Sequence, residues 1–142
     1  MTKSTNPAEP FIATRNHHTR ELAEDYVEIV YDLIQEKKEA RVCDIAEHIG
    51  VSHVTVIRTI DRLKKRGLLA SNQHQPITLT AEGESLAKLC KERHTFLLQY
   101  LLALGVPEGI AKIDVEGMEH HISPATMNAF KRHLSSISCL DK

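Results

Sequence analysis

The spacing of apolar residues predicts a long helix in the first third of the chain. Apolar residues recur at intervals of three and four, which places them on one face of a helix. They are Leu22, Tyr26, Ile29, Val30, Leu33 and Ile34. The preceding residues, 1–16, contain Thr, Ser, Asn and two prolines without any period, so we predict a disordered tail there. The helix should begin at about His17.

Two short amphipathic segments on either side of a glycine predict a helix-turn-helix between residues 41 and 66. Gly50 can adopt the left-handed conformation that ends a helix, and Ser52 is placed to cap the next one, 53–66. Thr and Arg side chains on this second helix suit contacts to phosphates and base edges. The predicted DNA contacts are Ser52, His53, Thr55, Arg58, Thr59 and Arg62. The alternative is an ordinary helical hairpin with a solvated basic face.

The rest of the chain predicts a β-hairpin and three further helices. We expect strands at 68–71 and 76–80, around a turn in which only His74 can carry positive charge, so this wing should add little DNA affinity. Thr80 is placed to cap a long helix that is apolar around much of its girth, which predicts a subunit interface as well as a core. Two more helices should begin at Pro107 and after Ser123.

Composition and charge narrow the class of protein. The 142 residues suffice for one ordinary domain or two small ones that share a core. The net charge of −1 by itself predicts no polyanionic partner. The longest apolar run, 96–106, is too short to span a bilayer, and no signal-like leader opens the chain. Three scattered cysteines argue against a disulfide framework or a Cys-x-x-Cys zinc site, so we expect a cytoplasmic protein without a membrane partner.

An acidic and histidine-rich segment, Asp114-Val115-Glu116-Gly117-Met118-Glu119-His120-His121, is the most informative stretch of the chain. On a helix, Glu116, Glu119 and His120 share one face. Carboxylates that converge without a basic partner repel one another and favour a bound cation. Hard oxygen donors with imidazole nitrogens suit manganese or ferrous iron better than copper or a thiolate-rich zinc site. The alternative is a solvated acidic face that happens to end in histidines.

A second acidic cluster strengthens the metal interpretation. Asp25 and Glu28 lie three residues apart on the first predicted helix, and His94 lies in a long helix between the two clusters. The four carboxylates of Asp25, Glu28, Glu116 and Glu119 would balance two divalent cations. Each residue also has a simpler interpretation, as a helix-surface acid or a packing histidine.

With these motifs in view, residues 18–134 resemble the diphtheria-toxin-repressor superfamily, and within it the manganese transport regulator branch. The motifs that carry the resemblance are Glu24-Asp25-Tyr26-Val27-Glu28, Glu92-Arg93-His94 and residues 114–121. The resemblance implies that two manganese ions per subunit, for which other divalent cations can substitute, bind to Asp25, Glu28, His94, Glu116, Glu119 and His120. It also implies that Glu28 and Glu119 bridge the ions and that His121 is not a direct ligand.

The same resemblance separates the manganese branch from the iron-responsive one. Iron-type relatives look to have methionine where this chain has Asp25 and cysteine where it has Glu116, and both positions here are hard carboxylates. They usually also have an extra small barrel domain, for which this chain leaves no room. Val54 stands where close relatives often have proline, and Ile57 replaces a commonly small residue. These two departures bear on the operator sequence.

The expected fold is mostly α, with a winged helix-turn-helix DNA-binding domain followed by an α-helical dimerisation and metal-binding domain. The expected boundaries are 1–16 for the tail, 17–80 and 81–137 for the two domains, and 138–142 for a short second tail.

The expected function is that of a metal-activated homodimer that binds palindromic double-stranded DNA and represses manganese uptake genes. We expect no catalytic residue and no small-molecule substrate. Three alternatives stay open: an iron-responsive regulator of the same superfamily, a winged-helix regulator of a small organic ligand, and a binuclear metallohydrolase. The last lacks a recognisable general base or substrate loops.

Overall fold

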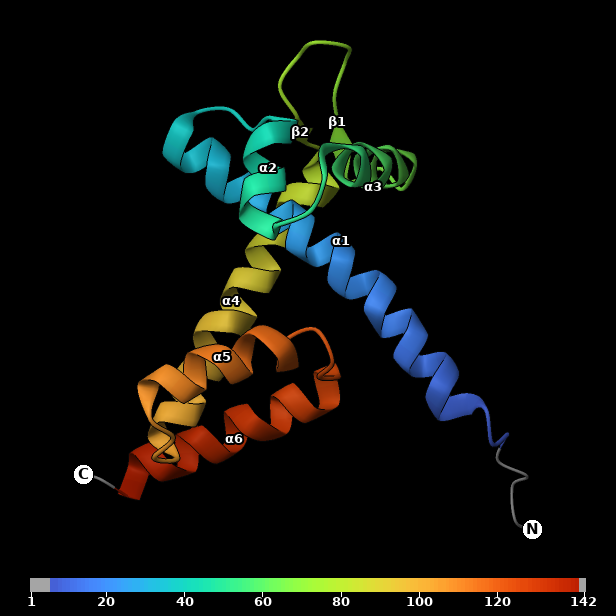
Figure 1. Cartoon of the computed structure of the whole chain (residues 1–142). Helices are drawn as coiled ribbons and strands as arrows, with labels where there is room; N and C mark the ends of the chain where they lie inside the picture. Colours follow the sequence, from blue (N-terminus) through green and yellow to red (C-terminus); the bar gives the residue numbers. More distant parts are fainter. Residues whose placement is uncertain (1–5, 141–142) are drawn as a thin grey trace. The chain divides into compact units, whose positions relative to one another are not determined.

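The computed structural model describes residues 6–140, apart from the side chains of His17, Cys139 and Leu140. The chain divides into two compact units, residues 1–90 and 91–142. The division falls inside one long helix, α4 (Ala81–Ala103), which begins in the first unit and ends in the second. Figure 1 labels the helices and strands of each unit.

The first helix, α1 (Glu9–Lys37), begins earlier than the apolar stripe predicts. Pro10 lies in its first turn, where a fixed φ favours helix and a missing N–H costs no hydrogen bond. The prediction of a disordered tail is therefore wrong for residues 9–16, and residues 1–5 lie outside the described residues. Most of the predicted stripe faces the core, but Leu22 at its start is 40% exposed.

The helix-turn-helix is confirmed. Helix α2 (Val42–Ile49) ends at Gly50, whose φ of 77° is the left-handed conformation that glycine adopts without strain. Helix α3 (His53–Lys65) begins at Ser52, whose hydroxyl accepts a hydrogen bond from the Thr55 N–H at 3.2 Å. These two local signals, a glycine stop and a serine cap, make the turn predictable from sequence.

A short antiparallel hairpin follows α3. Strand β1 (Leu69–Ala70) pairs with β2 (Thr78–Leu79), with Leu69 opposite Leu79. Both strands are shorter than predicted, and the loop between them extends well beyond the paired residues (Figure 1). Thr80 then caps α4 as predicted, since its hydroxyl oxygen accepts from the Gly83 N–H at 3.0 Å.

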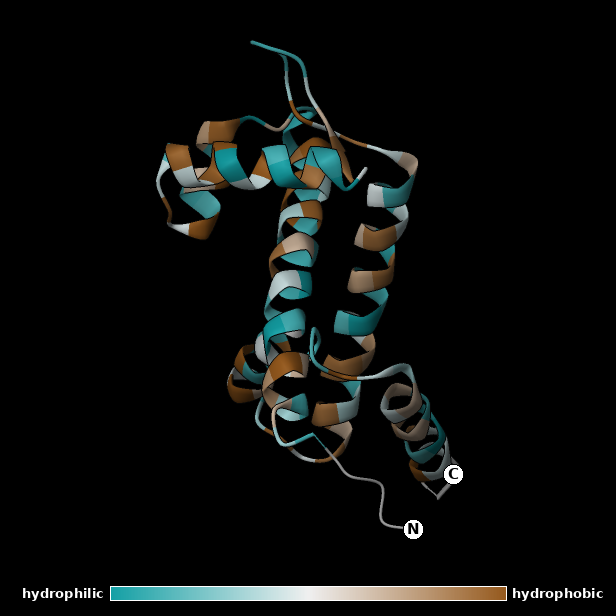
Figure 2. Ribbon diagram, turned by 90° about the vertical axis from the view of Figure 1, so that its right-hand side faces the viewer, coloured by the Kyte–Doolittle hydropathy of each residue, from teal (hydrophilic) through white to brown (hydrophobic). Residues whose placement is uncertain are grey.

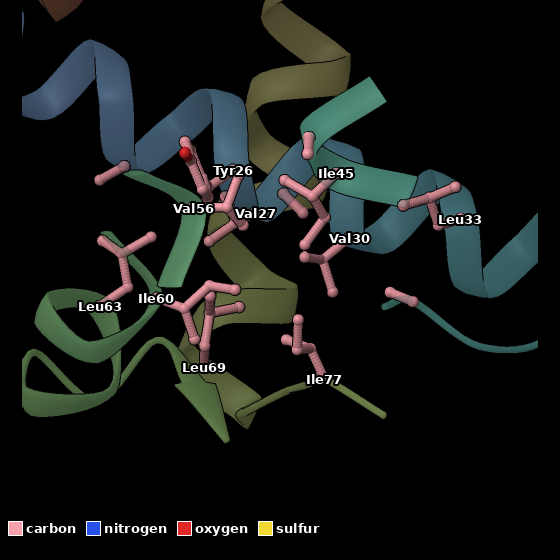
Figure 3. Close-up of a cluster of buried hydrophobic side chains, with 14 residues drawn as sticks. Tyr26, Val27, Val30, Leu33, Ile45, Val56, Ile60, Leu63, Leu69 and Ile77 are labelled. Atoms are coloured by element: carbon pink, nitrogen blue, oxygen red, sulfur yellow. The ribbon is translucent and has the colours of Figure 1, made fainter. Parts of the chain in front are cut away.

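The core of the first unit joins all of its elements. Side chains from α1, α2, α3 and the hairpin meet in one buried cluster (Figure 3). The labelled members are Tyr26, Val27, Val30 and Leu33 of α1, Ile45 of α2, Val56, Ile60 and Leu63 of α3, and Leu69 and Ile77 of the hairpin. Burial of these apolar side chains fixes the orientation of α3 within the unit.

The second unit comprises the end of α4 with α5 (Glu108–Met118) and α6 (Pro124–Leu140). Leu97, Val115 and Met127, one from each helix, form its buried centre. The Ser123 hydroxyl caps α6 by accepting from the Thr126 N–H at 3.2 Å, as predicted. Helix α6 continues through residues 138–140, where a tail was predicted, and residues 141–142 lie outside the described residues.

Among residues 6–140, no helix combines the length and apolar character that crossing a membrane requires. Hydrophilic and hydrophobic residues both occur along the length of the long helices (Figure 2).

Candidate metal centre and nucleic-acid interface

Glu119 lies at the centre of a cluster of predicted metal ligands within the second unit. One carboxylate oxygen, Oε2, is 2.7 Å from His94 Nδ1, and the other, Oε1, is 3.2 Å from His120 Nε2. Glu116 approaches the same histidine, with its Oε1 3.8 Å from His94 Nδ1. Four of the six predicted ligands therefore converge, although His94 precedes the others by more than twenty residues.

Two of these ligands are buried. Glu119 is 1% exposed and His120 is 2% exposed, whereas the Glu116 side chain is 69% exposed. Burial raises the pKa of the Glu119 carboxyl, and the hydrogen bond from His94 and the charge of His120 oppose that rise. A buried carboxyl group beside two imidazoles is typical of a metal ligand, because a bound cation would balance the charge of the carboxylate.

The geometry of α5 differs from the continuous helix that the sequence predicts. The helix ends at Met118, Glu119 keeps helical dihedrals as its C-cap, and His120 follows in the turn. Of the three residues predicted to share a helix face, only Glu116 and Glu119 therefore do so. The turn brings His120 to Glu119 instead, and His121 is exposed.

Asp25 and Glu28, the other two predicted ligands, lie on α1 in the first unit. Both are half-buried, three residues apart and therefore on one side of the helix. Glu24 beside them is 1% exposed and faces the interior, although an acidic side chain is rarely buried. The spacing of Asp25 and Glu28 agrees with the sequence analysis, and their part in a metal site stays a prediction.

The donor atoms of the cluster suit a hard divalent cation. Carboxylate oxygens and imidazole nitrogens are its ligand types, and no sulfur belongs to it within the described part of the chain. Manganese and ferrous ions accept such mixed oxygen and nitrogen sets, whereas thiolates would favour zinc or copper(I). The residues present therefore fit manganese.

The candidate nucleic-acid interface is the exposed side of α3. His53, Thr55, Arg58 and Arg62 are exposed, and the last turn carries Arg62, Lys64 and Lys65. The predicted exposure of Thr59 is wrong. Its position on the core side of α3 leaves it 5% exposed, and its hydroxyl donates to the Thr55 carbonyl at 3.0 Å, so it cannot present a polar group to DNA.

Two exposed residues of α3 were missed as candidate contacts. Val54 and Ile57 are 57% and 49% exposed, on the side of α3 that bears Arg58. Val54 lies four residues before Arg58 and three residues before Ile57, and these helical spacings could have indicated the placement. The two residues were not predicted as contacts because polar side chains were preferred for contacts to DNA.

Two family models match the chain in succession. Residues 18–75 match the N-terminal DNA-binding domain of iron-dependent repressors, and residues 80–139 match their metal-binding and dimerisation domain. Each predicted DNA contact lies within the first match. His94, Glu116, Glu119 and His120 lie within the second, and Asp25 and Glu28 lie in the first.

Individual relatives agree with these models. The transcriptional regulator MntR of Escherichia coli O157:H7 is 47% identical over 123 residues, which cover 87% of this chain and 79% of the relative. The HTH-type transcriptional regulator MntR of Bacillus subtilis strain 168 is 41% identical over 100 residues, or 70% of each chain.

A solved structure described as a manganese-dependent transcriptional repressor complex with manganese has a TM-score of 0.69 and 28% identity. The match covers 80% of this chain and about half, 52%, of that one. The order of elements, the helix-turn-helix, the ligand cluster and these similarities agree. This chain therefore belongs to the iron-dependent repressor family, as an MntR-type transcriptional regulator.

Proposed function

We propose that this protein is a manganese-activated regulator that binds palindromic operator DNA as a cytoplasmic homodimer and represses manganese uptake genes. The observation that carries the proposal is the convergence of His94, Glu119 and His120 in the unit that matches a metal-binding and dimerisation domain. The basic, exposed side of α3 supports the DNA-binding half of the proposal.

The proposed ligand set is Asp25, Glu28, His94, Glu116, Glu119 and His120, for two ions per subunit. When bound, the ions supply positive charge that offsets the four carboxylates. In their absence, Asp25 and Glu28 repel each other on α1, and the buried Glu119 bears the cost of desolvation. Because the proposed ligands come from α1 and from the second unit, bound metal would favour one arrangement of the two units. The presentation of α3 to DNA would then also depend on metal.

The direct test is DNA binding titrated separately with manganese and with ferrous ion, under anaerobic conditions and at several salt concentrations. Duplexes selected from a random-sequence pool in the presence of manganese serve as operators. We expect manganese to tighten binding, and higher salt to weaken it because basic residues of α3 displace counterions from DNA. DNA binding that is indifferent to both metals would refute the proposal.

Two substitutions test the choice of manganese in the same titration. Asp25→Met and Glu116→Cys replace hard oxygen donors by sulfur, so they should weaken activation by manganese more than activation by softer divalent ions. Equal activation of the wild type by ferrous ion would favour an iron-responsive regulator. An unchanged manganese response in Asp25→Met would remove Asp25 from the ligand set.

A further inference from the structure

The exposed side of α3 carries two large apolar side chains beside its basic residues. Val54 and Ile57 are 57% and 49% exposed, while Val56, Ile60 and Leu63 on the opposite side are buried in the core of the first unit. Both exposed side chains are β-branched, so a helix holds their χ1 angles in narrow ranges. They therefore present fixed apolar surfaces to whatever contacts α3.

The polar groups available for base recognition on α3 are fewer than the sequence suggests. Thr59 is buried and bonded to the Thr55 carbonyl. The hydroxyls of Ser52 and Thr55 lie 3.0 Å apart and hydrogen bond to each other, and Ser52 also accepts the Thr55 N–H. These hydroxyls are already engaged in the start of the helix. Recognition of sequence therefore draws on His53, Arg58 and Arg62 and on the apolar pair.

Ile57 lies between the exposed side of α3 and a hollow beside the hairpin loop. It lines a cavity of about 680 Å³, to which α3 also contributes His53, Asp61 and Lys64, and the hairpin loop contributes residues 71–75. Lys64 and Asp61 place opposite charges on this surface, and the Arg41 guanidinium is paired with Glu39 at 3.0 Å. The exposed basic residues of the same helix, Arg58, Arg62 and Lys65, favour an anionic polymer over an apolar peptide as the partner of α3.

We propose that Ile57 is a specificity-determining residue that packs against the C5 methyl group of a thymine in each operator half-site. The inference rests on the proposed DNA-binding function. The thymine methyl is the apolar feature that base pairs present in the major groove, where an α-helix fits. Against any other base, Ile57 would cover donors or acceptors without replacing their hydrogen bonds. Thymine at that position is therefore favoured.

The test removes single methyl groups from the DNA. Duplexes selected by the wild-type protein with manganese are resynthesised with deoxyuridine in place of one thymine of one half-site at a time. We expect one position at which this replacement weakens binding by about fourfold, the effect of burying a single methyl group. Ile57→Ala should bind the thymine and uracil duplexes at that position equally, while still requiring manganese.

Val54→Ala provides the matched control, because Val54 is equally apolar and exposed but does not line the cavity. It should keep the thymine preference at the Ile57 position. The inference is overturned if manganese-dependent binding shows no methyl dependence at any thymine, or if Ile57→Ala keeps the wild-type ratio at every position. In both cases the proposed function stands. A protein that selects no duplex with manganese overturns the proposed function as well.

Discussion

At the scale of single residues, Glu119 has opposite consequences for stability without and with metal. It is 1% exposed, and burial raises the pKa of its carboxyl. A carboxyl whose pKa is higher in the folded than in the unfolded state favours folding below the unfolded value. That contribution is lost as pH rises through the folded value. In the metal-free protein, ionisation of the buried Glu119 carboxyl therefore lowers the free energy of unfolding.

Glu119→Gln should separate these two consequences. Without metal at pH 7, we expect the free energy of unfolding to be at least that of the wild type, because a neutral amide replaces a buried charge of similar shape. Manganese at about one hundred times its Kd should stabilise the wild type by about 2.7 kcal/mol for each site that it fills and the variant by much less. Chemical denaturation with and without manganese measures both effects.

Asp114→Asn is the control for this prediction. Asp114 is an exposed acid of α5 outside the proposed ligand set, so its removal should leave the stabilisation by manganese unchanged. If Glu119→Gln kept the full stabilisation, Glu119 would be a buried partner of His94 and not a ligand.

At the scale of elements, the same cap chemistry begins one helix in each unit. Ser52 accepts the Thr55 N–H at the start of α3, and Ser123 accepts the Thr126 N–H at the start of α6, each at 3.2 Å. Loss of such a cap costs about 1 kcal/mol of stability. Ser52→Ala and Ser123→Ala should therefore lower the free energy of unfolding by similar amounts.

DNA binding should distinguish the two cap variants. Ser52 orders the first turn of α3, which carries His53 and Thr55, so Ser52→Ala should weaken manganese-dependent DNA binding while Ser123→Ala leaves it nearly unchanged. Equal DNA affinities for the two variants would mean that the first turn of α3 does not contact DNA. Binding isotherms on one selected duplex decide between these results.

The elements that could be predicted from sequence are those whose ends are decided locally. Gly50, Ser52, Thr80 and Ser123 each act within a few residues, so their glycine stops and caps are visible in the sequence. The burial of Thr59 was missed because a threonine hydroxyl can donate a hydrogen bond to a carbonyl of the preceding helical turn. A threonine on a helix can therefore lie either in the core or on the surface.

The ligand cluster required more than local pattern. Glu116 and Glu119 are neighbours by helix geometry, but His94 reaches Glu119 only because α4 and α5 pack around Leu97 and Val115. Spacing alone does not determine that packing. His94 was a candidate from its place between the two acidic clusters, and the family resemblance implied that it is a ligand. The end of α5 at Met118 likewise depends on a turn that carries no glycine or proline signal of its own.

At the scale of the whole molecule, α4 connects the unit that matches a DNA-binding domain to the unit that holds the buried candidate ligands Glu119 and His120. If metal favours the conformation that binds DNA, linkage requires DNA to favour metal by the same factor. We therefore expect the Kd for manganese to fall when a selected duplex is present, by the factor by which manganese lowers the Kd for DNA. Titration of manganese into the protein, alone and saturated with duplex, measures this factor.

Arg58→Ala distinguishes the coupling between metal binding and DNA binding from a direct effect of the substitution on the metal centre. Arg58 is an exposed residue of α3, and none of the proposed metal ligands lies on that helix. Its loss should weaken DNA binding by about 1–3 kcal/mol if it contacts a base, and should leave the Kd for manganese without DNA unchanged. A duplex that saturates the wild type yet leaves its manganese affinity unaltered would contradict metal activation. Manganese would then stabilise the protein without controlling its binding to DNA.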